Sequence, residues 1–339
     1  MTLTGKQVLI TGGAGFIGSH IVDAYLDEPV AKVIVFDDFS SGTQDNLAHI
    51  DDNRLVVVAG NILNKSEIDE CFKQHKIDIV NHLAAELEVY RGIENVQWEA
   101  EINIFGTINV LQACLQYGVK KVLYASSGGI YGQAKSIPQK ENHPWDPHWP
   151  YGVSKLAAER YCRQFYQLHG LPTVAFRYAI IYGPREWYGR VLTMFLRRVF
   201  IENKPPVVFG DGKQRRDYLY VTDVARAHIL ATKNDSAAGH VFNLGSAHGI
   251  SIGQLAEKIV GKSGRELKVI YDDPPEGQAS QHQPGRVRLV GELQDFILDY
   301  QQAEKHLGWK PTVDFDEGLD QQIAWLLENP KRWNTKPKV

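Results

Sequence analysis

A tyrosine and a lysine four residues apart are the strongest candidates for catalytic chemistry in this sequence. Tyr151 and Lys155 belong to the run Tyr-Gly-Val-Ser-Lys, and on a helix this spacing places both side chains on one face. A free tyrosine titrates near ~10, so a tyrosine base at neutral pH needs a pKa lowered by roughly 4 kcal/mol of interaction. A lysine ammonium about 4 Å away supplies about 4 kcal/mol at an effective dielectric near 20. We therefore expect Lys155 to prepare Tyr151 for proton transfer.

Two serines upstream strengthen this interpretation. Ser126 and Ser127 directly follow the apolar run 122–124, and ligands of parallel sheets bind beyond the carboxyl ends of the strands. Ser127 can donate a hydrogen bond to a substrate oxygen while Tyr151 exchanges its proton. The tyrosine–lysine spacing alone is also typical of a surface pair, so the serines are what favour a catalytic site.

A glycine-rich turn near residue 12 is typical of dinucleotide binding. Gly12, Gly15 and Gly18 follow the first apolar run and open a helical stretch, where a pyrophosphate meets free N–H groups and the positive end of the helix dipole. Asp37 ends the second apolar run, and a carboxylate there binds both ribose hydroxyls and repels a 2′-phosphate. The sequence therefore predicts NAD rather than NADP, with Asp38 as the weaker candidate for the ribose contact.

Short apolar runs alternate with helical stretches through the first half of the chain. This alternation predicts an α/β fold with a Rossmann-type, doubly wound parallel sheet. We expect an NAD-binding domain over residues 1–179 and a smaller, mixed α/β substrate-binding domain over most of 180–339. The chain is expected to return to the first domain at about 222–249, and the tail 331–339 to fray. The runs that we assign to strands are 8–10, 33–36, 55–58, 77–80, 122–124, 173–176 and 241–244.

The composition excludes several functional classes. The 339 residues include 43% hydrophobic and 23% charged residues, and 37 basic against 40 acidic residues give a net charge of −3. This balance argues against a nucleic-acid or anionic membrane partner, and no apolar run is long enough to span a bilayer. Three distant cysteines, Cys71, Cys114 and Cys162, favour neither disulfides nor a metal site and fit a cytoplasmic protein.

The motifs, taken in order, resemble the extended short-chain dehydrogenase/reductase family, specifically its nucleotide-sugar epimerases and dehydratases. The resemblance covers roughly residues 6–310. The matching stretches are 11–18, 82–85, 102–106, 126–132, 151–155, 177–184, 210–223 and 307–309.

The resemblance implies the residues of a cofactor site and a substrate site. Those implied for NAD are Gly12, Gly15, Phe16, Ile17, Gly18, Asp37, Asp38, Ser40, Ser41, Gly42, Asn61, Ile62, Leu83, Ala84, Ala85, Asn103, Ser126, Tyr151, Lys155 and Tyr178. Those implied for a nucleotide-diphosphate sugar are Ser127, Tyr151, Arg185, Arg190, Val191, Val207, Phe209, Arg216, Arg288 and Glu292. Within this second set, Val207 and Phe209 correspond to the segment that packs on the base, and Arg216 to the diphosphate-binding arginine. The resemblance also implies a homodimer formed by the helix around 102–117 and the helix that carries Tyr151 and Cys162.

The chain departs from the family pattern in its substrate half. Ile180 replaces an asparagine that binds the diphosphate, and Leu289 stands where an arginine is expected. Two buried phosphate charges without partners would be costly. We therefore expect Arg190 or Arg288 to compensate. In addition, Glu86 replaces a common glutamine, and Asn61 replaces a common aspartate.

The reaction is inferred from two glycines. The 4,6-dehydratases of the family carry an acid pair where this chain has Gly128 and Gly129, so no acid is left there to protonate a leaving hydroxyl. Reversible oxidation at C4 needs only NAD, Ser127, Tyr151 and Lys155. The favoured reaction is thus 4-epimerisation of a UDP-hexose through a 4-keto intermediate. C2-epimerisation, 4,6-dehydration, keto-sugar reduction and a non-catalytic NAD sensor remain as alternatives.

A few conspicuous residues outside these motifs have structural explanations. His82 ends a strand and is expected to be a packed structural histidine. The proline-rich stretch 145–149 is interpreted as a covering loop rather than a metal site. Trp187 and Tyr188 are interpreted equally as pocket wall or as packing. Arg185 and Arg190 would suit an acidic sugar, although exposed arginines on a helix are common.

Overall fold

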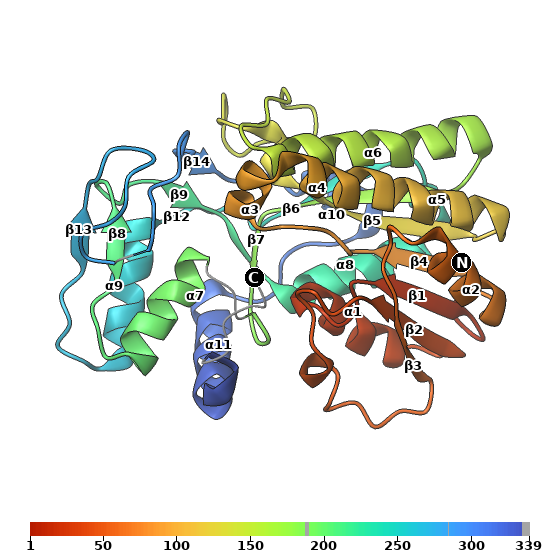
Figure 1. Cartoon of the computed structure of the whole chain (residues 1–339), viewed down its shortest axis with the longest axis horizontal. Helices are drawn as coiled ribbons and strands as arrows, with labels where there is room; N and C mark the ends of the chain where they lie inside the picture. The colour runs from red at the N-terminus through yellow and green to blue at the C-terminus, as the bar shows by residue number, and fades with distance from the viewer. Residues whose placement is uncertain (187–189, 284, 334–339) are drawn as a thin grey trace.

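A seven-stranded parallel sheet forms the centre of the chain (Figure 1). The computed structural model describes residues 1–186, 190–283 and 285–333. The strand order is β11-β6-β5-β4-β1-β2-β3, with every pairing parallel. This sheet confirms the predicted Rossmann-type fold and all seven expected strands. Their bounds are β1 Gln7–Thr11, β2 Lys32–Asp37, β3 Leu55–Ala59, β4 Ile79–His82, β5 Lys121–Ser127, β6 Thr173–Tyr178 and β11 Val241–Leu244.

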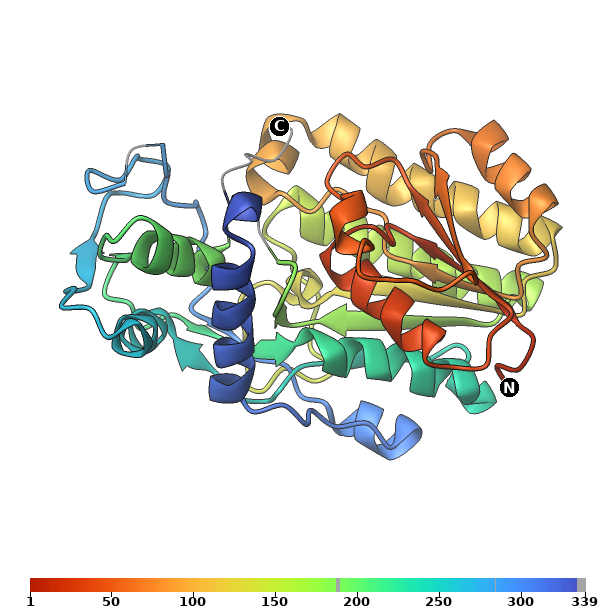
Figure 2. The ribbon, with the colours of Figure 1, turned by 90° about the horizontal axis from the view of Figure 1, so that it is seen from below.

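Helices cover both faces of the sheet (Figures 1 and 2). Successive side chains of a strand point to opposite faces, so Val8 and Ile10 join one buried cluster while Leu9 joins the other. The first cluster lies under α1 and α8, and the second under α2, α5 and α6. The bounds are α1 Phe16–Leu26, α2 Lys65–Gln74, α3 Val89–Glu94, α4 Val96–Ala100, α5 Thr107–Gln116, α6 Pro150–His169, α8 Val221–Lys233 and α10 Gln301–Leu307.

The remaining elements pack beside the carboxyl ends of the sheet strands, on the left in Figure 1. Parallel pairs join β7 to β10 and β8 to β13, while β9 lies between β12 and β14. A separate buried cluster lies beneath α7, α9 and α11. The bounds are β7 Ile180–Tyr182, α7 Val191–Leu196, β8 Val207–Phe209, β9 Arg215–Arg216, β10 Tyr218–Tyr220, β12 Ile250–Ser251, α9 Ile252–Ser263, β13 Ile270–Asp272, β14 Asp295–Phe296 and α11 Phe315–Glu328.

None of the helices in the described parts of the chain has the length and apolarity needed to cross a membrane. The three cysteines, Cys71, Cys114 and Cys162, are buried free thiols.

Candidate active site

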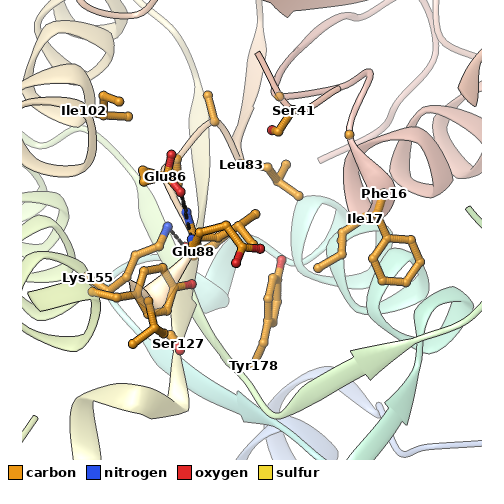
Figure 3. Close-up of a pocket in the computed structure, with 18 of the residues that line it drawn as sticks. Phe16, Ile17, Ser41, Leu83, Glu86, Glu88, Ile102, Ser127, Lys155 and Tyr178 are labelled. Atoms are coloured by element: carbon orange, nitrogen blue, oxygen red, sulfur yellow. Dashed lines mark hydrogen bonds between the residues drawn. The ribbon is translucent and has the colours of Figure 1, made fainter. Parts of the chain in front are cut away.

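A large cavity lies where the carboxyl ends of the sheet strands face α7, β7 and β9. Its volume is about 970 Å³. Residues from both parts of the chain line it, and Figure 3 shows those of the sheet domain, from Phe16 to Tyr178. The predicted residues that line it are Gly12, Gly15, Phe16, Ile17, Gly18, Asp37, Asp38, Ser40, Ser41, Asn61, Ile62, Leu83, Ala84, Ala85, Ser126, Ser127, Tyr151, Lys155, Tyr178, Arg190 and Arg216.

The glycine turn after β1 forms the floor of one half of the cavity. Gly12 has φ +70°, and a Cβ there would lie 2.7 Å from the backbone nitrogen of Ala84. At Gly18 a Cβ would lie 2.1 Å from the carbonyl oxygen of Gly12. Only glycine therefore allows the turn to meet the end of β4 and lets α1 begin this close to the strand.

Asp37 ends β2 with a carboxylate already held in place. Its Oδ2 accepts a hydrogen bond from the backbone of Ala14, and its Oδ1 accepts one from Phe39, both at 2.9 Å. Burial raises the pKa of Asp37, and the two N–H donors oppose that effect. Gly42 lies outside the cavity lining, but a Cβ there would come within 2.9 Å of Oδ1. Gly42 thus leaves room for the carboxylate that the ribose would meet.

Asn61 makes a contact that the family's usual aspartate would not make. Its Nδ2 donates to the Asp38 carboxylate at 3.1 Å, while its Oδ1 accepts from the backbone of Leu63. An aspartate at this position would place a second negative charge beside Asp38. The amide therefore fixes the loops after β2 and β3 to each other at the rim of the cavity.

The catalytic candidates meet at the start of α6 and the end of β5. Tyr151 and Lys155 lie one turn apart on α6, as predicted, and Ser127 is the last residue of β5. The Lys155 Nζ donates to the Ala125 carbonyl at 2.8 Å. Ser127 Oγ accepts from the Gly129 backbone at 3.0 Å. Burial lowers the pKa of Lys155 to about 8, and the charge of Glu99 opposes this shift.

Arg190 is a second cation whose charge acts on Tyr151. Burial raises the pKa of Tyr151, and the largest opposing influences are the charge of Arg190 and a hydrogen bond with Ser127. Lys155 instead directs its ammonium to a backbone carbonyl. The Lys155 Nζ lies 5.9 Å from the centre of the Tyr151 ring, and its expected effect on Tyr151 stays a prediction. A second cation, Arg190 from the N-terminal end of α7, also acts to lower the pKa of Tyr151.

Asn103 lies behind the cavity wall rather than in it. Its Oδ1 accepts from the backbone of Glu86, and its Nδ2 reaches Ser154 Oγ at 3.1 Å. The same amide group contacts the buried Glu99 carboxylate, which also accepts from Ser154 Oγ at 2.5 Å. This network ties the loop after β4 to α6. Asn103 is therefore placed to position cavity residues without lining the cavity itself.

Two buried histidines are structural at the sheet ends. His82 lies between the hydroxyls of Thr11 and Thr107, at 2.6 and 3.0 Å, and burial lowers its pKa to about 3. This agrees with the expected packed histidine. His228 on α8 contacts the Tyr178 hydroxyl at 2.5 Å and Asn81 at 2.7 Å. Tyr178 is thereby fixed in the cavity wall.

The substrate half of the cavity carries a different set of arginines from the one that the sequence indicated. Arg216 lines the wall, with its guanidinium 3.6 Å from Glu292. Arg190 and Arg197 of the α7 region also line it, while the aliphatic Ile180 forms part of the same wall. Sequence reasoning missed Arg197, because nothing in the local pattern distinguishes it from a surface arginine. It also missed the lining residues Glu88, Trp98, Trp149, Thr193, Met194, Leu293 and Phe296.

Several predicted substrate residues do not line this cavity. Arg185 pairs with Asp23 at 2.5 Å and contacts His20 at 2.7 Å, so its guanidinium is held against α1. Arg288 pairs with Asp273 at 2.5 Å and donates to the Pro274 carbonyl. The expectation that Arg288 compensates for the lost diphosphate contacts is therefore not supported. Of the two proposed arginines, only Arg190 lies at the cavity.

The segment expected to stack on a nucleotide base is covered by another side chain. Val207 and Phe209 are buried in β8, and neither lines the cavity. The Arg286 guanidinium lies 4.3 Å from the centre of the Phe209 ring and donates to the Val207 carbonyl. Val191 and Glu292 also lie outside the lining. Arg286, which sequence reasoning missed, therefore lies over one face of the Phe209 ring.

The loop at 145–149 contributes one side chain to the cavity. Trp149 lines it, and its indole Nε1 donates to the Val290 carbonyl at 3.0 Å. This agrees with a covering loop. Trp187 and Tyr188, and the tail from 334, lie outside the described residues. The described residues contain no group of three or more side chains suited to hold a metal ion.

A parallel sheet with this strand order, a glycine turn after β1 and a tyrosine–lysine–serine set define a short-chain dehydrogenase/reductase. Comparison with known proteins specifies the branch. The profile of the family described as GDP-mannose 4,6 dehydratase matches residues 9–322. The chain belongs to the extended short-chain dehydrogenase/reductase family of NAD-dependent nucleotide-sugar epimerases and dehydratases.

Relatives within this family catalyse different reactions. A putative UDP-glucose 4-epimerase of Methanocaldococcus jannaschii is 35% identical over 95% of this chain and 99% of its own length. The crystal structure of Thermotoga maritima UDP-glucose 4-epimerase with UDP-glucose is 34% identical, with a TM-score of 0.85 over 96% of this chain and 99% of that one. A dTDP-glucose 4,6-dehydratase of Streptomyces venezuelae, solved with NAD bound, is 28% identical, with a TM-score of 0.86 over 96% and 98%.

Proposed function

We propose that this protein is an NAD-dependent 4-epimerase of a nucleotide-diphosphate hexose, with a UDP-hexose as the first candidate substrate. The observation that carries the proposal is the shared cavity, in which Ser127, Tyr151 and Lys155 meet the dinucleotide cradle. Gly129 also supports the proposal, because a Cβ at this position would lie 3.2 Å from Ser127 Oγ and 4.0 Å from the Tyr151 ring. The glycine leaves that space without an acid group.

The residues present fit NAD. Gly12 and Gly18 form a cradle that a Cβ would fill, and the N-terminus of α1 faces it without a capping side chain. This arrangement suits a pyrophosphate. The Asp37 carboxylate, fixed by two N–H groups, suits the ribose diol. Leu83, Ala84, Ala85 and Tyr178 would line the nicotinamide end.

Each catalytic side chain has a role that follows from its position. Tyr151 would remove the proton of the sugar 4-hydroxyl, and Ser127 would donate a hydrogen bond to the same oxygen. Lys155 would hold the nicotinamide ribose, since its ammonium is anchored at the end of β5. Bound NAD⁺ would provide the hydride acceptor for C4 and, after the 4-keto sugar has turned over in the cavity, the hydride donor for its opposite face. Tyr151 would then give its proton back to the new alcohol.

The diphosphate would meet arginines from the second half of the chain. Arg190 and Arg216 line the cavity beyond Tyr151, and Arg197 lies near them. These guanidinium groups would replace the hydrogen bonds that Ile180 and Leu289 cannot make. Arginine suits this role because its planar donors bind phosphate oxygens in pairs.

Product analysis tests the proposal. The purified protein should be incubated with UDP-, dTDP-, GDP- and CDP-hexoses, and the products read by NMR. A 4-epimer formed without added cofactor is the expected result. A 4-keto-6-deoxy sugar would favour the dehydratase alternative, a C2-epimer or a reduced keto sugar would assign those reactions, and binding without turnover would favour an NAD sensor.

We also propose a homodimer through the outer faces of α5 and α6. Apolar side chains are exposed in these helices and in the helical segment 101–106 that runs into α5, with Phe105 59% and Leu168 73% exposed. Val153 and Tyr161 extend the same surface along α6. Light scattering coupled to size-exclusion chromatography should give twice the mass of the chain. Charged substitutions at Phe105 and Val153 should reduce that mass to the mass of one chain. The expected cytoplasmic location remains a prediction.

A further inference from the structure

The loop after β4 brings two glutamates to the cavity, and only one of them is satisfied by the protein. The Glu86 carboxylate accepts hydrogen bonds from the backbone of Leu87 at 3.1 Å and of Glu88 at 2.8 Å. Its second oxygen lies 3.4 Å from the Arg91 guanidinium. Glu86 therefore orders the loop and has its charge balanced.

Glu88 has a different environment. It is the N-cap residue, directly before the first residue of α3, but its side chain makes no capping hydrogen bond. Within residues 1–186, 190–283 and 285–333, no group donates a hydrogen bond to its carboxylate or forms an ion pair with it. Figure 3 shows this side chain projecting into the middle of the cavity, between Tyr178 on one side and Ser127 and Lys155 on the other. Burial raises the pKa of Glu88, and the charge of Arg190 opposes the rise.

A partly buried carboxylate needs hydrogen-bond donors, and here a ligand is placed to provide them. We propose that Glu88 is a specificity-determining residue that favours sugars presenting hydroxyl or ammonium groups to it and disfavours sugars bearing a carboxylate. This inference rests on the proposed function, since it places the sugar of a nucleotide sugar beside Ser127 and Tyr151.

The role of Glu88 also argues against an acidic sugar as the substrate, which Arg185 and Arg190 had suggested in the sequence. Arg185 is held against α1 by Asp23 and is not at the cavity. Arg190 is at the cavity, but its charge acts on the carboxyls of both Glu88 and Glu186. An acidic sugar placed between Glu88 and Tyr151 would meet a like charge, and like charges at close range select strongly against a ligand.

Binding of three matched ligands tests the proposal. Titration calorimetry on the protein as purified would compare UDP-glucose, UDP-glucosamine with its free amine, and UDP-glucuronic acid. The wild type should bind the acidic sugar at least about tenfold more weakly than the neutral one. Glu88→Gln keeps the size and an acceptor oxygen but removes the charge. In this variant, the ratio of the affinity for UDP-glucose to that for UDP-glucuronic acid should fall about fivefold or more. Any preference for UDP-glucosamine over UDP-glucose should disappear.

Glu94→Gln is the matched control, because Glu94 is exposed at the other end of α3. It should leave all three affinities as in the wild type. Tighter binding of the acidic sugar by the wild type, or an unchanged ratio in a folded Glu88→Gln variant, would overturn the role of Glu88 alone. No binding by any UDP-sugar, nor by the matching dTDP-sugars, would overturn the proposed function as well. If the Glu88→Gln variant does not fold, tighter binding of UDP-glucuronic acid than of UDP-glucose by the wild type would still overturn the role of Glu88.

Discussion

Arg190 at the N-terminal end of α7 and Tyr151 at the start of α6 line one cavity, and the charge of the arginine lowers the pKa of the tyrosine. The two residues come from different parts of the chain, Tyr151 from a helix on the sheet and Arg190 from the part beside the carboxyl ends of the sheet strands. The part of the chain that would recognise the sugar therefore also adjusts the group that would take its proton.

Arg190→Gln should shift the pH dependence of turnover. Since Arg190 lowers the pKa of Tyr151, its loss raises that pKa, and the basic form required for proton abstraction appears only at higher pH. The rising limb of kcat/KM against pH should move to the alkaline side, with activity at pH 7 reduced about 10- to 100-fold. Arg288→Gln is the control, because its guanidinium pairs with Asp273 away from the cavity. If the rising limb of the pH profile is at the same pH in Arg190→Gln as in the wild type, Arg190 does not lower the pKa of Tyr151.

Tyr151→Phe should abolish turnover while preserving the fold. The substitution removes only the titratable oxygen, so bound dinucleotide and thermal stability should match the wild type. Turnover should fall at least about a hundredfold, in the range found for loss of a general base. Activity above about a tenth of wild type would mean that another group takes the proton. Deuterium at C4 of the substrate should slow the wild type when chemistry limits the rate.

Gly42→Ala should reduce the dinucleotide carried by the purified protein. A Cβ at this position would lie 2.9 Å from an oxygen of Asp37 and 2.9 Å from the backbone of Ala14, so the carboxylate or the glycine turn must move. The wild type should release NAD or NADH on denaturation, and the variant should release less. NADP as the main wild-type species would contradict the role of Asp37.

Gly261→Ala provides the control for that experiment. The position lies in α9, and a Cβ there meets nothing within 4 Å. Alanine is the better helix former, by about 1 kcal/mol. This variant should keep its full dinucleotide content and gain slightly in stability. Equal losses in both variants would show that the effect at Gly42 is not local.

Glu186→Gln should stabilise the protein at alkaline pH. Burial raises the pKa of Glu186 from 4.5 to about 7, so the folded state binds its proton more tightly than the unfolded state does. The stability is therefore present below about pH 4.5 and is lost as pH rises towards 7, by roughly 3 kcal/mol at most. The variant removes this loss and keeps an oxygen to accept from Gln322, as Glu186 does at 3.0 Å.

Urea unfolding at pH 5, 6.5 and 8 measures this effect. The difference in the free energy of unfolding between Glu186→Gln and wild type should grow with pH. Glu94→Gln, an exposed site, should show no such trend. A difference that is the same at all three values would contradict a raised pKa for Glu186.

The parts of the molecule that follow from local pattern were predictable from sequence. The seven sheet strands, the turn at Gly12 and the spacing of Tyr151 and Lys155 each depend on residues close together in the chain. Contacts between distant segments were not predictable in the same way. Arg286 covers Phe209 from 77 positions away in the numbering, and nothing in either local sequence indicates it.

Charge partners explain the other differences. Arg185 and Arg288 carry guanidinium groups that could bind phosphate. Ion pairs with Asp23 and Asp273 hold these groups away from the cavity. Glu88 looks like an ordinary helix start in the sequence. The role that we propose for Glu88 follows from the fold, because its side chain lines the cavity and makes no capping hydrogen bond to α3. An ionic side chain takes its role from its partner, and the partner is set by the fold.

The path of the chain between β6 and β11 limits how this protein can be divided or recombined. After β6 the chain leaves the sheet, builds β7 to β10, and returns through α8 to place β11 beside β6. A single cut near residue 180 would leave β6 with an open hydrogen-bonding edge, and such edges pair with other chains. It would also remove α8 from the sheet face shared with α1. A chimera that borrows another enzyme's sugar pocket therefore needs at least two junctions, one on each side of the α8–β11 segment.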